Sequence, residues 1–194
     1  MGTRGAVGFR VDGADKVAYN HFDSYPDGLG ADVVEFIRDK FLSLGVEGMR
    51  KAAREIDRID TDVPPTKDQQ ARFAPIADLG VSNRSLTDWY CLLRKLQGDL
   101  GAYVEHKAIP GGGEKFMLDS LFCEWAYVVN VDDMTLEVYK GFQEAPHDLG
   151  RYAALPGDGK YFPVALVAAF PLDDIPRNWI KQVEPDEEDE DAAE

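Results

Sequence analysis

The chain of 194 residues has few of the features that mark membrane, secreted or metal-binding proteins. Its two cysteines, Cys91 and Cys123, match neither a disulfide framework nor a metal motif, and we expect two buried thiols in a reducing compartment. The histidines His21, His106 and His147 have no metal-ligand spacing either, so no metal or cofactor is expected. No run of about 18 apolar residues occurs, and no basic segment followed by an apolar one opens the chain. A cytoplasmic protein that does not bind membranes is the expectation.

Basic residues are in the minority, because 21 Lys and Arg stand against 36 Asp and Glu and give a formal net charge of −15. Eight of the carboxylates fall within residues 184–194, where no basic residue occurs. A surface of this sign repels phosphate backbones, so direct binding of nucleic acid is not expected. Residues 181–194 are predicted to form a disordered acidic tail, which either keeps the protein soluble or mimics nucleic acid towards a basic partner.

Alternation of apolar and polar residues predicts two β-hairpins and one further strand. The first hairpin has an Asp-Gly pair at its turn, which is a strong local signal for this structure. The last strand is apolar almost throughout, as in a central strand that is covered on both faces. The expected strands are residues 4–11, 16–22, 121–131, 136–142 and 161–170.

Apolar residues at helical spacing predict helices between the two hairpins. The expected helices are residues 26–45, ended by a glycine, then 46–59, and then 85–97, which opens with a Ser-Leu-Thr-Asp cap. Residues 103–109 are expected to form a short strand. The proline-rich stretch 60–83 is expected to be a surface excursion or a lid.

The order of these elements is hairpin, helices, hairpin, strand. It predicts an α+β fold in which three or more helices pack on an antiparallel sheet of two hairpins plus the further strand. We see no internal repeat, and we expect a single domain over residues 2–180.

The stretch 19–30, between a predicted strand and a predicted helix, is the densest in groups that can do chemistry. His21 and Asp23 are two residues apart, so on a strand they share a face and could form an oriented acid–base pair. Ser24 could serve as a nucleophile beside them. The candidate catalytic residues are His21, Asp23 and Tyr25.

The same turn is a candidate binding site. Gly28 and Gly30 would let an anion approach the backbone N–H groups at the start of the helix. Arg4 could pair with Asp23 or hold an anion beside it, and Glu124 could face Asp23 if the two hairpins are neighbours. The alternative is a structural turn in which a polar side chain caps the helix. The candidate binding residues are Arg4, Ser24, Gly28, Gly30 and Glu124.

The opening Gly2-Thr3-Arg4 and the later His21-Phe-Asp-Ser-Tyr-Pro-Asp-Gly-Leu-Gly30 resemble a group of uncharacterised bacteriophage and bacterial proteins. Those proteins start with Gly-Thr-Arg or a close variant and carry His-x-Asp-(Gly/Ser)-Tyr-Pro before their first helix. Residues 124–127 and 138–141 look like the second block of the same group. The resemblance implies a phage or prophage accessory protein and carries no activity with it.

A fainter similarity is to the N-terminal-nucleophile hydrolases and the glutamine amidotransferases built like them. Those enzymes also open with a hairpin, and some have an Arg-Gly-Pro-Asp-x-x-Gly turn. Here removal of Met1 would expose Gly2, which has no side chain to attack with, and Thr3 would need a further cleavage. This similarity implies a relative in fold.

The expected function is therefore that of a small acidic accessory protein that binds a protein of the host or of the phage, in the host cytoplasm. The alternative is a hydrolase or transferase, related to the N-terminal-nucleophile fold, with its site at residues 19–30. The sequence leaves open whether the protein is an enzyme.

Overall fold

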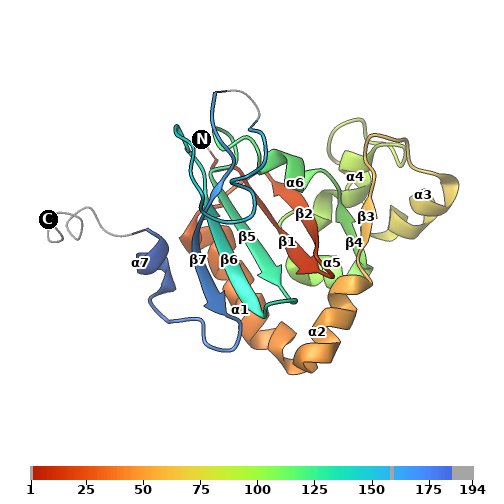
Figure 1. Cartoon of the computed structure of the whole chain (residues 1–194). Coiled ribbons are helices and arrows are strands. Elements are labelled where there is room, and N and C mark those ends of the chain that lie inside the picture. Colours follow the sequence, from red (N-terminus) through yellow and green to blue (C-terminus); the bar gives the residue numbers. More distant parts are fainter. Residues whose placement is uncertain (1, 158–159, 185–194) are drawn as a thin grey trace, which may run out of the picture.

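A five-stranded sheet forms the centre of the computed structural model, which describes residues 2–157 and 160–184 (Figure 1). Its strands are β1 (Gly5–Val11), β2 (Ala14–Asn20), β5 (Trp125–Asn130), β6 (Thr135–Lys140) and β7 (Ala165–Pro171). They lie in the order β2-β1-β5-β6-β7, with β1 parallel to β5 and all other neighbours antiparallel. The two predicted hairpins and the last strand thus share one sheet, and the α+β prediction is confirmed. The sheet is mixed and not antiparallel throughout as expected, because the two hairpins join through the parallel pair β1–β5.

The prediction that the last strand is central is wrong, because β7 lies at the edge of the sheet. It also begins later than expected, at Ala165. It is covered only in part: Ala165 and Phe170 are buried, whereas Val167 is 37% exposed beside a register shift in the pairing with β6. The sequence pattern is that of a covered strand because the exposed positions of β7 also hold small apolar residues, Val167, Ala169 and Pro171.

Helical residues run from Pro26 to Leu44, with non-helical backbone at Gly28. This stretch consists of η1 (Pro26–Gly30), α1 (Ala31–Phe36), η2 (Ile37–Phe41) and η3 (Leu42–Leu44). The stretch ends at Gly45, which has a φ of 66° and is the first residue of α2 (Gly45–Arg54). The predicted end of the helix at this glycine is therefore confirmed, and its positive φ is one that glycine adopts readily.

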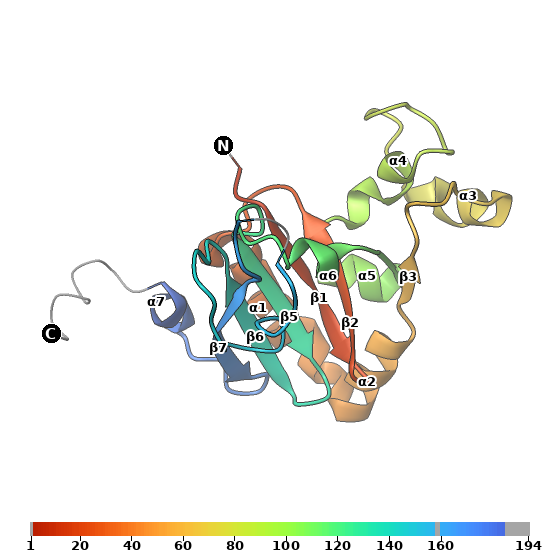
Figure 2. The same ribbon diagram turned by 45° about the horizontal axis from the view of Figure 1, so that its top comes forward.

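The remaining elements are mostly short. They are β3 (Asp57–Ile59), α3 (Lys67–Phe73), η4 (Ala74–Ile76), α4 (Trp89–Leu93), η5 (Arg94–Leu96), α5 (Leu100–His106), β4 (Ala108–Pro110), α6 (Gly113–Phe116) and α7 (Trp179–Val183). Strands β3 and β4 pair in parallel as a separate ribbon. In both views α3 and α4 project from one side of the molecule, and α7 lies beside β7 on the other (Figures 1 and 2).

Two expected elements have a different structure. The helix expected over 46–59 stops at Arg54, because residues 57–59 pair with β4 instead. Residues 103–106, expected as strand, are helical, since Asp99 accepts a hydrogen bond from the Ala102 N–H at 2.9 Å and caps α5.

The helix expected over 85–97 also begins later. Residues 85–88 form a turn, and Asp88 is the residue that caps α4, by accepting a hydrogen bond from the Tyr90 N–H at 2.9 Å. Within the expected excursion 60–83, α3 starts with a capping box formed by Thr66 and Gln69.

Both faces of the sheet are covered. The larger core includes Val7, Phe9, Tyr127, Val129 and Leu136 from the strands and Val33, Ile37, Phe41, Met49 and Tyr103 from the helices. The smaller core, on the other face, joins Ala6, Val17, Ala126, Val128 and Tyr139 to Met117, Tyr152 and Val164. Both cysteines are buried, as expected.

The C-terminal boundary expected at residue 181 falls inside α7, in which Trp179 and Val183 are buried against the larger core. The rest of the expected tail, residues 185–194, lies outside the described residues. None of the helices in the described part of the chain combines the length and the apolar character that crossing a membrane requires.

Lys16 joins the sheet to the C-terminal end of α2. Its ammonium group donates hydrogen bonds to the carbonyl oxygens of Ala53, Arg54 and Ile56 at 2.9, 2.9 and 2.7 Å. Carbonyls at a helix end have no partner within the helix, and a cation there also interacts favourably with the helix dipole. Lys16 therefore holds α2 against β2.

We predict that Lys16→Met lowers the free energy of unfolding by roughly 1–3 kcal/mol, because three carbonyls lose their donor. Urea denaturation measures this change. Lys51→Met is the matched control: Lys51 is 77% exposed on α2 and pairs with Glu55 at 3.9 Å, so its loss should cost less than about 0.5 kcal/mol. Equal effects of the two substitutions would contradict this role of Lys16.

Candidate functional site

The candidate site residues lie together at one end of the sheet. Strands β1 and β5 begin there, and β2 and β6 end there. The Ser24 N–H donates to the Thr3 carbonyl at 3.2 Å, the Glu124 N–H to the Arg4 carbonyl at 3.0 Å, and the Gly141 N–H to the Glu124 carbonyl at 2.8 Å. The two hairpins are therefore neighbours, as the hypothesis that Glu124 belongs to this site required.

The backbone N–H groups of Gly28, Leu29 and Gly30 donate to carbonyls of the turn itself. Gly28 and Gly30 both donate to the Tyr25 carbonyl, at 3.1 and 3.2 Å, and Leu29 donates to the Asp23 carbonyl at 2.8 Å. A Cβ on Gly28 would lie 2.4 Å from the Asp23 carbonyl oxygen. The glycine is thus needed for close packing, and these N–H groups are not open to an anion.

Ser24 is fully buried beneath the turn. Its hydroxyl accepts a hydrogen bond from the Asn20 side chain at 2.9 Å, and its carbonyl accepts one from the Tyr127 hydroxyl at 3.1 Å. Gly30 lies nearby, where a Cβ would come within 2.7 Å of the Trp179 ring. Ser24 and Gly30 therefore fix the shape of the turn and do not face solvent.

The exposed candidates do not form the expected pairs. His21 Nδ1 lies 2.5 Å from the Tyr19 hydroxyl, and the Arg4 guanidinium lies 4.5 Å from the centre of the Phe122 ring. Among the described residues neither His21 nor Arg4 contacts the Asp23 carboxylate through a hydrogen bond or an ion pair. The acid–base pair and the Arg4–Asp23 pair are thus not formed in this structure.

Asp23 does not cap the helix that follows. The N-cap position is Tyr25, and no side chain caps this helix start. Asp23 itself is exposed and has a φ of 51°, in the left-handed region that Asp and Asn tolerate better than most residues. Its carboxylate is therefore available to a partner.

A groove of about 670 Å³ begins at Asp23 and lies between the helical stretch 28–40 and residues 97–101. Its apolar lining residues are Phe22, Leu29, Val33, Phe36 and Leu100. Its charged lining residues are Asp23, Asp32, Glu35, Asp39, Asp99 and Lys40. The groove therefore combines an apolar surface with five carboxylates and a single ammonium group.

The carboxylates of the groove are largely without partners. Asp32, Glu35 and Asp39 follow one another at helical spacing, so they lie on one face, and all three are exposed. None of the ion pairs within the described part of the chain involves a carboxylate of this groove. Asp99 differs because it caps α5.

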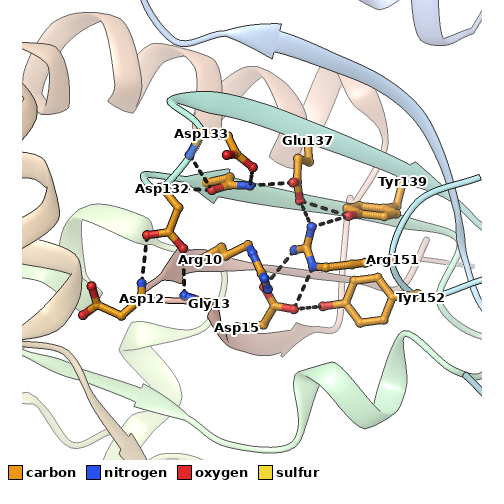
Figure 3. A network of polar contacts seen from close by, with 11 residues as sticks. Arg10, Asp12, Gly13, Asp15, Asp132, Asp133, Glu137, Tyr139, Arg151 and Tyr152 are labelled. Carbon is orange, nitrogen blue, oxygen red and sulfur yellow. Dashed lines mark hydrogen bonds and ion pairs between the residues drawn. The ribbon is translucent and has the colours of Figure 1, made fainter. Parts of the chain in front are cut away.

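A network of charged side chains that no pattern in the sequence indicates lies on the smaller-core face of the sheet (Figure 3). Arg151 holds Asp15 through two hydrogen bonds, from Nη2 at 2.7 Å and Nε at 3.0 Å, and its Nη1 also contacts Glu137. The Tyr152 hydroxyl donates to Asp15 at 2.8 Å, and the Tyr139 hydroxyl donates to Glu137 at 2.9 Å. Arg151 thus fastens the segment between β6 and β7 to strands β2 and β6.

Two further strands complete the network. Arg10 of β1 pairs with Asp15 at 3.2 Å. The side-chain amide of Asn130, on β5, donates to Glu137 at 2.8 Å, and its oxygen Oδ1 accepts hydrogen bonds from the backbone N–H groups of Asp132 and Asp133. The two arginines balance Asp15 and Glu137 in charge, as buried carboxylates require.

The protonation states of the network indicate a structural role. Burial opposes ionisation of Asp15, but hydrogen bonds and the charge of Arg151 outweigh it and lower the pKa of Asp15 below its ordinary value. Burial raises the pKa of Tyr139 and of Tyr152. The carboxylate therefore stays ionised and the phenols stay protonated near neutral pH, so none of these three groups exchanges a proton there. The described residues contain no group of three or more His, Cys, Asp and Glu side chains that could hold a metal ion.

We predict that Arg151→Met lowers the free energy of unfolding at pH 7 by about 3 kcal/mol, because two carboxylates lose their cation. A lowered pKa stabilises the fold above the ordinary Asp value of 3.8, and this contribution is lost as the pH falls through the lower folded value. Urea denaturation between pH 7 and pH 3 should therefore show the difference between wild type and variant shrink in acid.

Arg177→Met makes the same chemical change at an exposed position and should leave stability within about 0.5 kcal/mol. If Arg151→Met costs no more than this control, or if its cost does not change with pH, the network does not stabilise the fold in this way.

Similarity to other proteins assigns no activity to the groove or to the network. A scan against protein-family models, a search of curated proteins and a search of solved structures each found no match.

Proposed function

We propose that this protein acts by binding a protein partner, and that the groove beside the 19–30 turn receives a segment of the partner that carries both basic and apolar side chains. The observation that carries the proposal is the lining of the groove, in which five carboxylates and one ammonium group surround apolar residues. Lysine and arginine side chains suit such a surface, because their stems cover apolar residues while their charges meet carboxylates.

The arrangement of the carboxylates supports this proposal energetically. Like charges three or four residues apart on a helix destabilise it by roughly 0.2–0.5 kcal/mol per pair. Glu35 has such a neighbour on each side, Asp32 and Asp39, and none of the three has an ion-pair partner among the described residues. A binding surface, in contrast to a stabilising contact, accounts for carboxylates that cost stability.

The kind of partner that we propose, a protein of the host or of the phage, comes from the resemblance of residues 2–4 and 21–30 to the phage and bacterial group. The alternative, a hydrolase or transferase, has less support from the geometry. Ser24 is buried and already hydrogen-bonded, and His21 contacts Tyr19 instead of Asp23.

We predict that the triple variant Asp32→Asn, Glu35→Gln, Asp39→Asn binds the partner roughly tenfold more weakly, since each exposed ion pair contributes about 0.2–1 kcal/mol. Its stability should stay the same or rise slightly. Affinity capture from host lysate with quantitative mass spectrometry identifies the partner, and titration of the purified partner gives the affinities.

The control is the triple variant Asp148→Asn, Asp173→Asn, Asp174→Asn, which removes the same charge from exposed positions outside the groove. Equal weakening by both triple variants would mean that net charge and not the groove attracts the partner. Capture of no partner, together with turnover in a panel of hydrolase substrates, would favour the enzymatic alternative.

Asp23→Asn tests the 19–30 turn itself. Because Asn tolerates the left-handed conformation and Asp23 caps no helix, stability should change by less than about 0.5 kcal/mol, while partner affinity falls about two- to fivefold. Asp27→Asn, in the same turn but outside the groove lining, should change neither quantity. If Asp23→Asn lowers stability by the roughly 0.5–2 kcal/mol of a lost cap and binds normally, Asp23 is structural.

A further inference from the structure

A second hollow, of about 380 Å³, lies on the other side of the end of β2. Residues Asn20, Phe22 and Asp23 line the acidic groove, whereas Tyr19 and His21 line this hollow. The other lining residues of the hollow are Thr61, Trp89, Tyr90, Leu93, Arg94, Gln97, Pro110 and Gly111. They come from α4, η5 and the end of the β3–β4 ribbon.

The walls of the hollow are aromatic. Tyr19, Trp89 and Tyr90 contribute their rings, and Leu93 adds an aliphatic side chain. Tyr90 is 48% exposed although it is large and apolar, and Trp89 uses its N–H group elsewhere, in a hydrogen bond to the Val63 carbonyl at 2.7 Å. Aromatic walls of this kind favour a flat ring as ligand, because rings stack on one another and bury apolar area.

The charge of the hollow is opposite to that of the groove. Arg94 contributes a guanidinium group, and the lining residues include no carboxylate. Arg94 Nη1 donates to Gln97 Oε1 at 2.7 Å, and its guanidinium carbon lies 5.8 Å from the centre of the Tyr90 ring. These contacts hold the guanidinium at the hollow and leave its other N–H groups free to donate to an anion.

We propose that this hollow binds a small planar aromatic ring that bears one anionic group. The aromatic walls hold the ring, and the Arg94 guanidinium pairs with the anion. The volume is at the lower end of the range of small-molecule sites, roughly 300–1,000 Å³, and suits a ligand of one or two fused rings. The site is separate from the proposed protein-binding groove, although Gln97 lines both.

The test is a titration of the full-length protein with 2-naphthoate and with its uncharged isostere 2-naphthamide, by calorimetry and by ¹H–¹⁵N NMR. We expect 2-naphthoate to bind about fivefold more tightly, the effect of one charge pair at a half-exposed site. The largest NMR shifts should include the Trp89 indole N–H. Arg94→Gln should abolish the preference for the charged ligand, and Lys95→Gln, which removes the same charge from the neighbouring exposed residue, should keep it.

Tyr90→Ser provides a second variant, which should weaken both ligands by a similar factor and keep their ratio, since it removes a wall and leaves the cation. The NMR spectra of all variants report directly on folding. Failure of 2-naphthoate to bind at millimolar concentration, shifts that map outside the hollow, or a preference that survives Arg94→Gln would each overturn the proposal.

Discussion

The parallel pairing of β1 with β5 is the contact on which the rest of the structure depends, because it joins the two hairpins into one sheet. Two glycines of β1 allow its close approach to its neighbours, Gly5 on the side of β5 and Gly8 on the side of β2. A Cβ on Gly5 would lie 2.3 Å from the Trp125 carbonyl oxygen, and a Cβ on Gly8 would lie 2.0 Å from that of Lys16. With side chains at these positions β1 could not lie between both of its neighbours. The pairing also decides which ends of the strands meet, and so places residues 21–24 beside residue 124.

The two ends of this sheet differ in their polar contacts. At the end with the hairpin turns, Asp132 accepts hydrogen bonds from the Asp12 and Gly13 N–H groups at 2.8 and 2.9 Å. Arg54 donates two hydrogen bonds to the Asp12 carboxylate, each at 2.8 Å. The network around Arg151 lies towards the same end (Figure 3). Turns and segments are thus tied together there by polar contacts. The opposite end carries the 19–30 turn, in which the N–H groups of Ser24, Gly28, Leu29 and Gly30 donate to backbone carbonyls. The carboxylates of Asp23 and Asp27 are exposed there.

The sequence predicts those parts of the fold whose signals are local. Alternation and the Asp-Gly turn locate the hairpins, and Gly45 locates a helix end. The carboxylates at 32, 35 and 39 were not among the predicted site residues, although their helical spacing puts them on one face. The opposite wall of the groove, residues 97–101, is supplied by tertiary structure. Arg151 lies outside the helices and strands and is 136 residues from Asp15, so no local sequence pattern predicts that the two residues pair. Residues 57–59 and 103–106 were predicted wrongly because strand pairing and a helix cap outweigh their local propensities.

The distribution of ion pairs gives the acidic composition a structural meaning. Where a carboxylate is partly buried in the sheet, as Asp15 and Glu137 are, an arginine neutralises it. Carboxylates at the edges of elements are also paired, such as Asp57 with Arg72 at 3.0 Å. The carboxylates of the groove have no such partners among the described residues, although Lys40 lies in the same lining. Other exposed carboxylates, such as Asp148, Asp173 and Asp174, also take part in none of the ion pairs of the described residues. What distinguishes the groove is that five carboxylates lie beside apolar residues, and the proposed binding of a basic segment of a protein partner rests on this combination.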